Sequence, residues 1–205
     1  MKIARKYSHL NGEEFLIVHR NTLYDEIKSV ISAIQADEFK TKVSSEKTTR
    51  GKKFYSPVEL NREFKKRFNS FNWQESRYQY YITLDRELME KSLNLSAKQQ
   101  RKFLEEHGEK NPIFSYNQTD FVKNKVAVEV QFGKYAFVAY DIFVKHMLFY
   151  SGGLIDLGVE ILPTKAMQTQ MSSGVAYFEG EVYHVLRHGR NNPAIPLLIL
   201  GIEPD

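Results

Sequence analysis

The chain has 205 residues, 42% of them hydrophobic, and no cysteine. The length fits one domain, so we expect a single domain over residues 1–205, with 14 Phe and 12 Tyr available for its core. The absence of cysteine excludes disulfides and thiolate zinc sites. The N-terminal segment lacks the apolar region of a signal peptide, and no apolar run of about 18 residues occurs. We therefore expect a cytoplasmic protein.

Basic residues are clustered although the net charge is only +4. Segments 40–53 and 62–67 hold a large share of the lysines and arginines, and the first of them places its charges among Ser, Thr and Gly. A polar basic segment of this kind can contact phosphates, although many such segments are only solvated loops. The distribution favours a polyanionic partner.

Sequence patterns predict helices and strands along the whole chain. Apolar residues at helical spacing predict a helix over 22–36, with Thr22 at its cap. Ser56-Pro57-Val58-Glu59 predicts a second helix that ends near Asn69. The other expected elements are a strand at 77–84, a helix at 96–108, a hairpin at 116–132, a helix at 135–150, a strand at 155–162, a helix at 177–187 and a strand at 196–202. This alternation predicts an α/β fold, a mixed central sheet flanked by helices.

The segment 120–131 reads as two short strands joined by a turn at 124–125. With that turn Asp120 faces Glu129 across the hairpin, and facing Cβ atoms lie about 4.5–5.5 Å apart. Gln131 shares a face with Glu129. The apolar side chains of this stretch point the other way, into a core: Val126, Val128, Val130 and Phe132. Two carboxylates on one side of an apolar hairpin indicate a site for a hard cation such as Mg²⁺. The alternative is a solvated acidic pair.

Several segments resemble, in one order along the chain, the type II restriction endonucleases of the BglII and BstYI group. These are YSHLNG at 7–12, SYNQTDFVK at 115–123, VEVQFGKY at 128–135, FVAYD at 137–141, FVKHM at 143–147, GVEILP at 158–163 and MSSG at 171–174. The matches run nearly from end to end, so they are far more specific than the hairpin alone. The chain length is nearer to the BstYI side of the group.

The resemblance implies a PD-(D/E)xK nuclease core with Mg²⁺ as the cofactor. Asp120 and Glu129 match the metal-binding carboxylates, and the main-chain carbonyl of Val130 is the expected third ligand. Gln131 stands where most of the superfamily has lysine. Since glutamine carries no charge and is no base, it can only orient the attacking water, and the metal must lower the pKa of that water. The implied products are a 5′-phosphate and a 3′-hydroxyl.

The resemblance also implies side chains that read DNA bases. Lys134 matches a position near the major groove, where a lysine can donate to guanine O6 and N7. Ser172 and Ser173 precede Gly174 in a turn-like segment, and their hydroxyls can contact bases of either strand. The alternative for the two serines is an N-cap for a helix that begins near Val175. For Lys134 the alternative is an exposed charge at a helix start, which the helix dipole disfavours.

The implied target is a palindrome centred on GATC, cut before the G. The nearer match to BstYI favours R/GATCY, where R is a purine, over a strict A/GATCT site. A palindrome is read economically by a homodimer, and the apolar helix over 137–150 is the candidate for part of its interface. A cognate DNA methyltransferase is expected in the same prokaryotic cell. Two other functions stay open: a non-catalytic DNA-binding protein on this fold, and a repair or mobile-element nuclease that shares only the core.

Overall fold

A six-stranded mixed sheet forms the centre of the protein. The computed structural model describes residues 1–45, 47 and 49–205, so positions 46 and 48 of the basic segment lie outside the described residues. The strand order is β1-β8-β7-β6-β5-β4, in which β6, β7 and β8 are parallel to one another and the outer pairings are antiparallel. The strands are β1 Lys2–His9, β4 Gln74–Ile82, β5 Ile113–Lys123, β6 Val126–Val130, β7 Leu157–Pro163 and β8 Leu197–Glu203.

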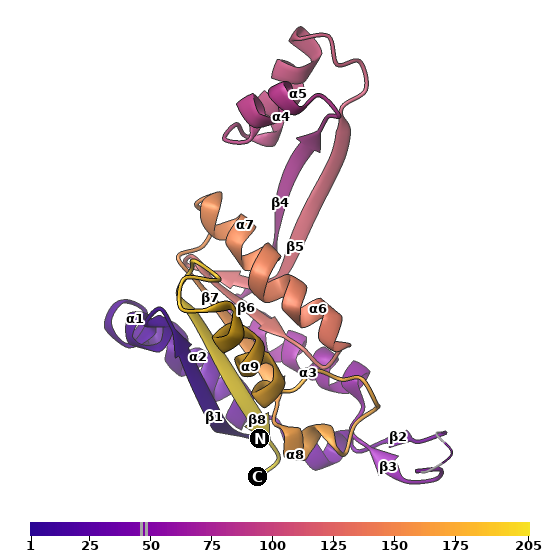
Figure 1. Cartoon of the computed structure of the whole chain (residues 1–205). Helices are drawn as coiled ribbons and strands as arrows, with labels where there is room; N and C mark the ends of the chain where they lie inside the picture. Colours follow the sequence, from indigo (N-terminus) through magenta and orange to yellow (C-terminus); the bar gives the residue numbers. More distant parts are fainter. Residues whose placement is uncertain (46, 48) are drawn as a thin grey trace.

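Helices cover both faces of this sheet (Figure 1). They are α1 Gly12–His19, α2 Asn21–Ser32, α3 Pro57–Ser70, α6 Tyr135–Tyr140, the π-helical turn η2 Asp141–Lys145, α7 His146–Ser151, α8 Lys165–Gln168 and α9 Phe178–His188. One core cluster joins alternate residues of the central strands to α2 and α3, with Phe64 and Val128 as members. A second cluster joins the other face to the α6–η2 helix and α9, through Val138, Leu162 and Val185. The predicted α/β architecture, a mixed sheet between helices, is confirmed.

The segment between β4 and β5, residues 83–112, projects from the sheet and is called the arm. Strands β4 and β5 run out of the body of the protein and carry α4 Arg86–Ser92 and α5 Ala97–Glu106 near their far ends (Figure 1). Helix α5 lies within the predicted helix 96–108 and is followed by Gly108 at φ +93°. A capping box between Ser96 and Gln99 opens it, which the sequence analysis did not predict. Helix α4 was not predicted.

Several element boundaries differ from the sequence predictions. Helix α2 begins at Asn21, and Thr22 lies inside it and is not its cap. Helix α3 starts as expected, since the Ser56 hydroxyl accepts a hydrogen bond from the Glu59 N–H at 3.4 Å. The sequence did not predict β1, α1 or α8, nor the short elements η1 Ala36–Phe39, β2 Lys42–Val43 and β3 Lys53–Phe54. In the described part of the chain, every helix is too short or too polar to span a membrane.

Candidate active site

The hairpin that the sequence singled out forms with the predicted register. Asn124 and Lys125 have φ values of 45° and 64°, and two successive positive φ angles are what a type I′ two-residue turn requires. Across the turn, Phe121 pairs with Val128. The ladder between β5 and β6 ends at this pair, one residue before Glu129. The strands therefore separate where the two carboxylates stand.

Glu129 is buried, with 1% of its surface exposed, and one of its oxygens is held by three donors. Oε1 accepts hydrogen bonds from Thr119 Oγ1 at 2.5 Å, from Asp120 N–H at 3.3 Å and from Lys145 Nζ at 2.8 Å. Among the described residues, none donates to Oε2 of Glu129. The backbone of Asp120 thus lies against Glu129 as predicted, while its own side chain is exposed.

The apolar side chains of the hairpin point to the opposite face, as expected from the alternation of a strand. All four belong to the large core cluster: Val126, Val128, Val130 and Phe132. This packing fixes which face of β6 the polar residues occupy, because a slip of one residue would bring Glu129 into the core.

Helix residues complete the polar side of the site. Lys145 Nζ lies 2.6 Å from Asp141 Oδ1, in addition to its contact with Glu129. The Gln131 side-chain amide donates to Asp141 Oδ2. Gln131 is thereby tied to Glu129 through two helix residues. Both of these helix residues are at least nine-tenths buried.

A buried His–Glu pair lies next to these groups. Glu160 on β7 pairs in register with Glu129 on β6, and its Oε1 lies 2.9 Å from His146 Nε2. Burial raises the pKa of Glu160 well above its usual value, and the neighbouring carboxylates raise it further. Burial lowers the pKa of His146 to about 3. At neutral pH we therefore expect a neutral pair joined by one hydrogen bond.

Burial also shifts the pKa values of the groups that contact Glu129. It raises the pKa of Glu129, Lys145 lowers it, and the charges of Asp120 and Asp141 raise it again, so the net shift is upward. Burial lowers the pKa of Lys145, but the two carboxylates in contact with it reverse this effect and raise it above its ordinary value. Lys145 is therefore charged, and it is the cation that partly neutralises this acidic cluster.

The residues present fit a hard divalent cation. In the described structure the carboxylate of Asp120 accepts no hydrogen bond and forms no ion pair, which leaves its oxygens available together with Oε2 of Glu129. Val130 lies beyond the last pair of the β5–β6 ladder, so this ladder does not pair its main chain with β5. No set of three or more His, Asp or Glu side chains placed to hold a metal occurs in the described ranges. A metal here would need the Val130 carbonyl or oxygens from a substrate phosphate, as Mg²⁺ commonly does.

The approach to Asp120 is open. Asp120 lines a cavity of about 420 Å³ together with Lys65, Asn72 and Glu75. Glu75 also accepts a hydrogen bond from Gln118 through its Oε2, at 3.2 Å. The exposed carboxylate of the pair thus faces a space that contains both a basic and an acidic side chain.

The two segments predicted to read bases lie side by side. An isolated β-bridge joins Lys134 to Val175, and the Tyr135 N–H donates to the carbonyl of Gly174 at 3.1 Å. Lys134 is exposed at the first position before α6. The position of Ser173 is exposed as well, next to the turn at Gly174, whose φ is +82°.

Ser172 contacts the basic segment, since its hydroxyl accepts a hydrogen bond from Lys42 Nζ. The alternative prediction that Ser172 and Ser173 cap a helix is wrong. Helix α9 begins at Phe178 with Tyr177 at the cap position, because the residues after Gly174 bridge to Lys134 instead.

Sequence reasoning missed five polar residues that contact the site or its buried partner: Thr119, Asp141, Lys145, His146 and Glu160. A signal was present in the sequence. Asp141 and Lys145 are charged residues four apart in a mostly apolar helix, and Glu160 interrupts an apolar strand. Charged residues in elements that are otherwise buried need partners, so they are candidates for a common site.

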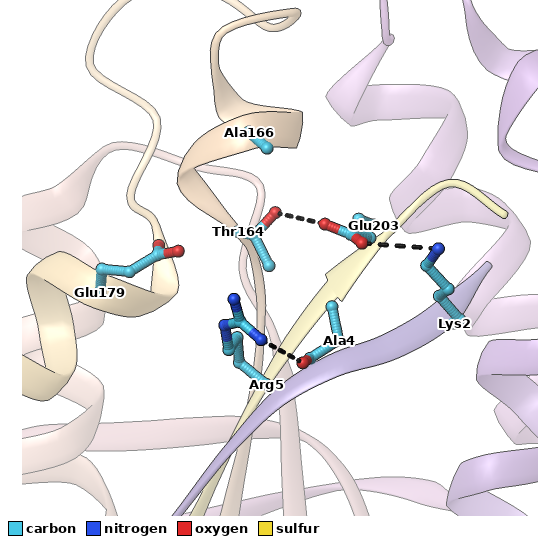
Figure 2. A pocket seen from close by; sticks show the side chains of 7 residues that line it. All are labelled: Lys2, Ala4, Arg5, Thr164, Ala166, Glu179 and Glu203. Atoms are coloured by element: carbon cyan, nitrogen blue, oxygen red, sulfur yellow. Dashed lines mark hydrogen bonds and ion pairs between the residues drawn. The ribbon is translucent and has the colours of Figure 1, made fainter.

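Asp120, Glu129 and Gln131 line none of the other cavities found in the described structure. Figure 2 shows one of about 300 Å³ at the β1 edge of the sheet. Its charges are paired locally: Glu203 accepts from Thr164 at 3.3 Å and lies 3.6 Å from Lys2 Nζ, and Arg5 donates to the carbonyl of Ala4. A more apolar cavity of about 680 Å³ is lined by residues of β4, the arm helices and the α6–η2–α7 helix, such as Tyr78, Met89 and Phe143.

Comparison with known proteins identifies the family. The family model described as restriction endonuclease BglII/BglIII matches residues 4–202. The crystal structure of BglII complexed with a DNA 16-mer superposes with a TM-score of 0.67 at 18% identity, over 100% of this chain and 78% of that chain. Free BglII gives a TM-score of 0.60 at 17% identity, over 100% and 81%. A search of curated proteins found no match.

The chain belongs to the BglII restriction endonuclease family, because the family model covers nearly its whole length. This confirms the resemblance seen in the sequence and classes the protein as a type II site-specific nuclease. The structural matches add that its mixed sheet and flanking helices are the fold of BglII.

Proposed function

We propose that this protein is an Mg²⁺-dependent restriction endonuclease that cuts double-stranded DNA at R/GATCY and leaves 5′-GATC overhangs with 5′-phosphates. The observation that carries the proposal is the placement of Asp120 and Glu129 at the point where β5 and β6 separate, in a chain of this family. The complex of BglII with DNA supports duplex DNA as the substrate class. We further propose that residues 1–205 act as one endonuclease domain.

The proposed chemistry is hydrolysis of a phosphodiester by in-line attack of water. Asp120, Glu129 and the carbonyl of Val130 would hold Mg²⁺, which supplies Lewis acidity and lowers the pKa of a bound water. Gln131 cannot take a proton at any working pH. Its amide nitrogen is occupied by Asp141, so its side-chain oxygen is the atom left to orient the water. Thr119 and the Asp120 N–H keep the Glu129 carboxylate in place during the reaction.

Base reading is assigned to the paired segments around Lys134 and Gly174. We propose that Lys134 donates to guanine O6 and N7 in the major groove. Ser172 and Ser173 would contact the outer base pair. A hydroxyl can donate to N7, which both purines share, so a serine at this position tolerates either purine. This argument favours the R/GATCY site over a strict A/GATCT site.

A homodimer is the proposed assembly. Several large apolar side chains of the α6–η2–α7 helix are exposed: Tyr135, Phe137, Tyr140, Val144 and Tyr150. Phe137, with 62% of its surface exposed, lies in the stretch that the sequence marked as a subunit interface. Scattered apolar residues on a surface are normal, but a row along one helix is typical of an interaction site. We propose that two subunits pair through it, in a prokaryotic cytoplasm that also holds the cognate methyltransferase.

Digestion of an unmethylated plasmid followed by sequencing of the ends tests this function. We expect discrete fragments only when Mg²⁺ is added, and ends that begin with 5′-GATC. Ends restricted to A/GATCT would assign the strict specificity instead. The absence of cleavage over a range of divalent ions would refute the nuclease function and leave a DNA-binding role on the same fold.

A further inference from the structure

Lys145 makes two contacts that link the two functional residues of β6. Its ammonium lies 2.8 Å from Glu129 Oε1 and 2.6 Å from Asp141 Oδ1. The other carboxylate oxygen of Asp141 accepts the hydrogen bond from Gln131. One cation therefore contacts Glu129 directly and reaches Gln131 through a single carboxylate.

The local helix geometry brings this lysine into the site. Residues Asp141–Lys145 form a π-helical turn, closed by a hydrogen bond from the His146 N–H to the Asp141 carbonyl. Such a turn inserts an extra residue into an α-helix and is frequent at functional sites. It lies between α6 and α7, opposite β6, and it gives the helix two buried charged side chains. In a regular α-helix the side chains of this segment would lie at different angles around the helix axis.

The charges of the cluster require a cation. Glu129 and Asp141 are both buried, and among the described residues Lys145 is the side chain whose ammonium contacts both of them. A buried carboxylate without a partner is strongly disfavoured and would move or be neutralised. Gln131 cannot supply the missing charge. Lys145 thus supplies the charge that balances Glu129, while Thr119 and the Asp120 N–H add neutral hydrogen bonds to the same oxygen.

We propose that Lys145 is a positioning residue of the cleavage site, which fixes Glu129 directly and Gln131 through Asp141. The proposal rests on the proposed function, because it assigns Lys145 a part in the same reaction. Lys145 contacts neither the scissile phosphate nor the attacking water in this account. It sets the orientation of a metal-binding carboxylate and of the amide that orients water, before metal and DNA bind.

A purely structural ion pair would give a different result from a positioning residue. Loss of a structural pair lowers the stability of the fold but leaves the orientation of Gln131 unchanged in the molecules that remain folded. Loss of a positioning residue changes that orientation in the folded, metal-free protein. The state of the Gln131 side chain is therefore the decisive observable.

The experiment compares Lys145→Met and Asp141→Asn with a matched control, Lys102→Met, whose lysine side chain is 78% exposed on α5. The first readout is the ¹⁵N–¹H signal of the Gln131 side-chain amide in metal-free protein, assigned by its loss in Gln131→Asn. The second is single-turnover cleavage of a GATC duplex with Mg²⁺. The third is the affinity for the same duplex without metal.

We expect Lys145→Met to shift the Gln131 amide signal and to slow cleavage by about 10–100-fold, the usual effect of losing a group that orients a ligand residue. Metal-free affinity for the duplex should not change, and the control should match the wild type in all three readouts. An unmoved Gln131 signal, or cleavage at the wild-type rate, overturns the proposal.

If Lys145→Met does not fold, Asp141→Asn decides the question with the same readouts, since it keeps the shape of the side chain, removes its charge and replaces one of the two acceptor oxygens that face Lys145 and Gln131 by an amide group. A shifted Gln131 signal with slower cleavage supports positioning of Gln131 through Asp141, and wild-type values refute it. Failure of the proposed function itself is recognised separately: the wild type would then not cleave, while the metal-free signal still reports whether Lys145 orients Gln131.

Discussion

The two halves of the candidate site differ in how their polar groups are held. Around Glu129 the groups are buried and bound to one another, with Thr119, Asp141 and Lys145 as partners. Around Lys134 they are more exposed: Lys134 and Ser173 lie at the surface, and Ser172 is half-buried and bound to Lys42. In the described structure the Lys134 ammonium forms no ion pair. The difference shows that Glu129 and Gln131 are oriented by the fold before substrate binds, whereas Asp120 and the groups assigned to base reading lie nearer the surface.

This contrast has an energetic reason. Groups that stabilise a transition state are most effective when they need no reorganisation during the reaction, and burial among fixed partners provides this. Groups that read bases must be able to exchange water for base edges, so they remain at the surface. The following substitutions separate the two halves, beginning with the largest expected effect.

Loss of either proposed metal ligand should remove cleavage and leave binding intact. In Asp120→Asn and Glu129→Gln we expect cleavage to fall by about 10³-fold or more, because several kcal/mol of charge stabilisation by the metal is lost. Duplex affinity, measured without metal, should stay close to that of the wild type, since the residues that read bases are elsewhere.

The matched control for these variants is Asp25→Asn, which changes an exposed carboxylate paired with Lys28 on α2. It should cleave like the wild type. Substantial Mg²⁺-dependent cutting by Asp120→Asn or Glu129→Gln would show that the metal is held elsewhere.

At position 131 a negative charge should slow cleavage more than a shorter neutral side chain does. Gln131→Glu places a third carboxylate beside Asp141 and Glu129 and removes the donor that Asp141 accepts from. Gln131→Asn keeps a neutral amide. We expect the Glu variant to cleave about tenfold more slowly than the Asn variant, since a like charge at this distance costs on the order of 1 kcal/mol or more. Equal rates in single-turnover assays would place Gln131 outside the reaction.

The proposed interface on the α6–η2–α7 helix can be tested independently of the chemistry. Phe137→Glu should weaken dimerisation by about 10-fold or more, because burying a phenylalanine contributes about 1.5–3 kcal/mol. Sedimentation equilibrium at micromolar protein is the measurement. Val58→Glu on α3, where the residue is 68% exposed, is the control and should leave the mass unchanged. A wild type that is monomeric with and without DNA would contradict the homodimer.

On the exposed half, Lys134→Ala should affect recognition without affecting the reaction step. We expect a loss of about 1–3 kcal/mol in discrimination between a GATC duplex and a mismatched one, the usual value for a lysine that contacts guanine. Competition binding without metal measures it, with Lys66→Ala as the control, since that lysine side chain is 79% exposed on α3. An equal loss on all sequences would instead mark Lys134 as a phosphate contact.

The last variant concerns the stability of the fold and changes Glu181, a buried carboxyl whose charge acts on Glu160. Burial raises the pKa of Glu181 to about 7, and Oε2 has no partner in the described structure. Since the folded pKa exceeds the ordinary value of 4.5, the stabilising contribution is complete below pH 4.5 and is lost as the pH rises through 7. Glu181→Gln should therefore match the wild type in urea unfolding near pH 4.5 and exceed its stability at pH 8 by about 1–3 kcal/mol. A difference that does not depend on pH would contradict this.

The buried half was only partly predictable from the sequence, for a physical reason. Asp120, Glu129 and Gln131 follow from a two-residue turn and from the alternation of a strand, which are local rules. Lys145 does not, because the π-helical turn that brings it to Glu129 leaves no trace in a helical period of 3.6 residues. Tertiary contacts, not local pattern, select that turn.

In the exposed half, a local sequence pattern predicted an element that tertiary contacts prevent. Ser172 and Ser173 have the local pattern of a helix cap, yet the bridge between Lys134 and Val175 delays the helix until Phe178. Strand β1 was missed because its exposure does not alternate: it lies at the edge of the sheet and mixes charged with apolar residues. The predicted α/β class is correct despite these errors, because the central strands β6, β7 and β8 are almost wholly buried and apolar.

A crystal structure with Mn²⁺ and a duplex that contains AGATCT tests the central claim most directly, because one experiment reports on both halves. We expect an anomalous peak within ligand distance of Asp120 and Glu129, with Lys134 at a guanine edge and Lys145 still in contact with Glu129. A metal peak away from both carboxylates, or duplex DNA bound on a different face of the sheet, would contradict it.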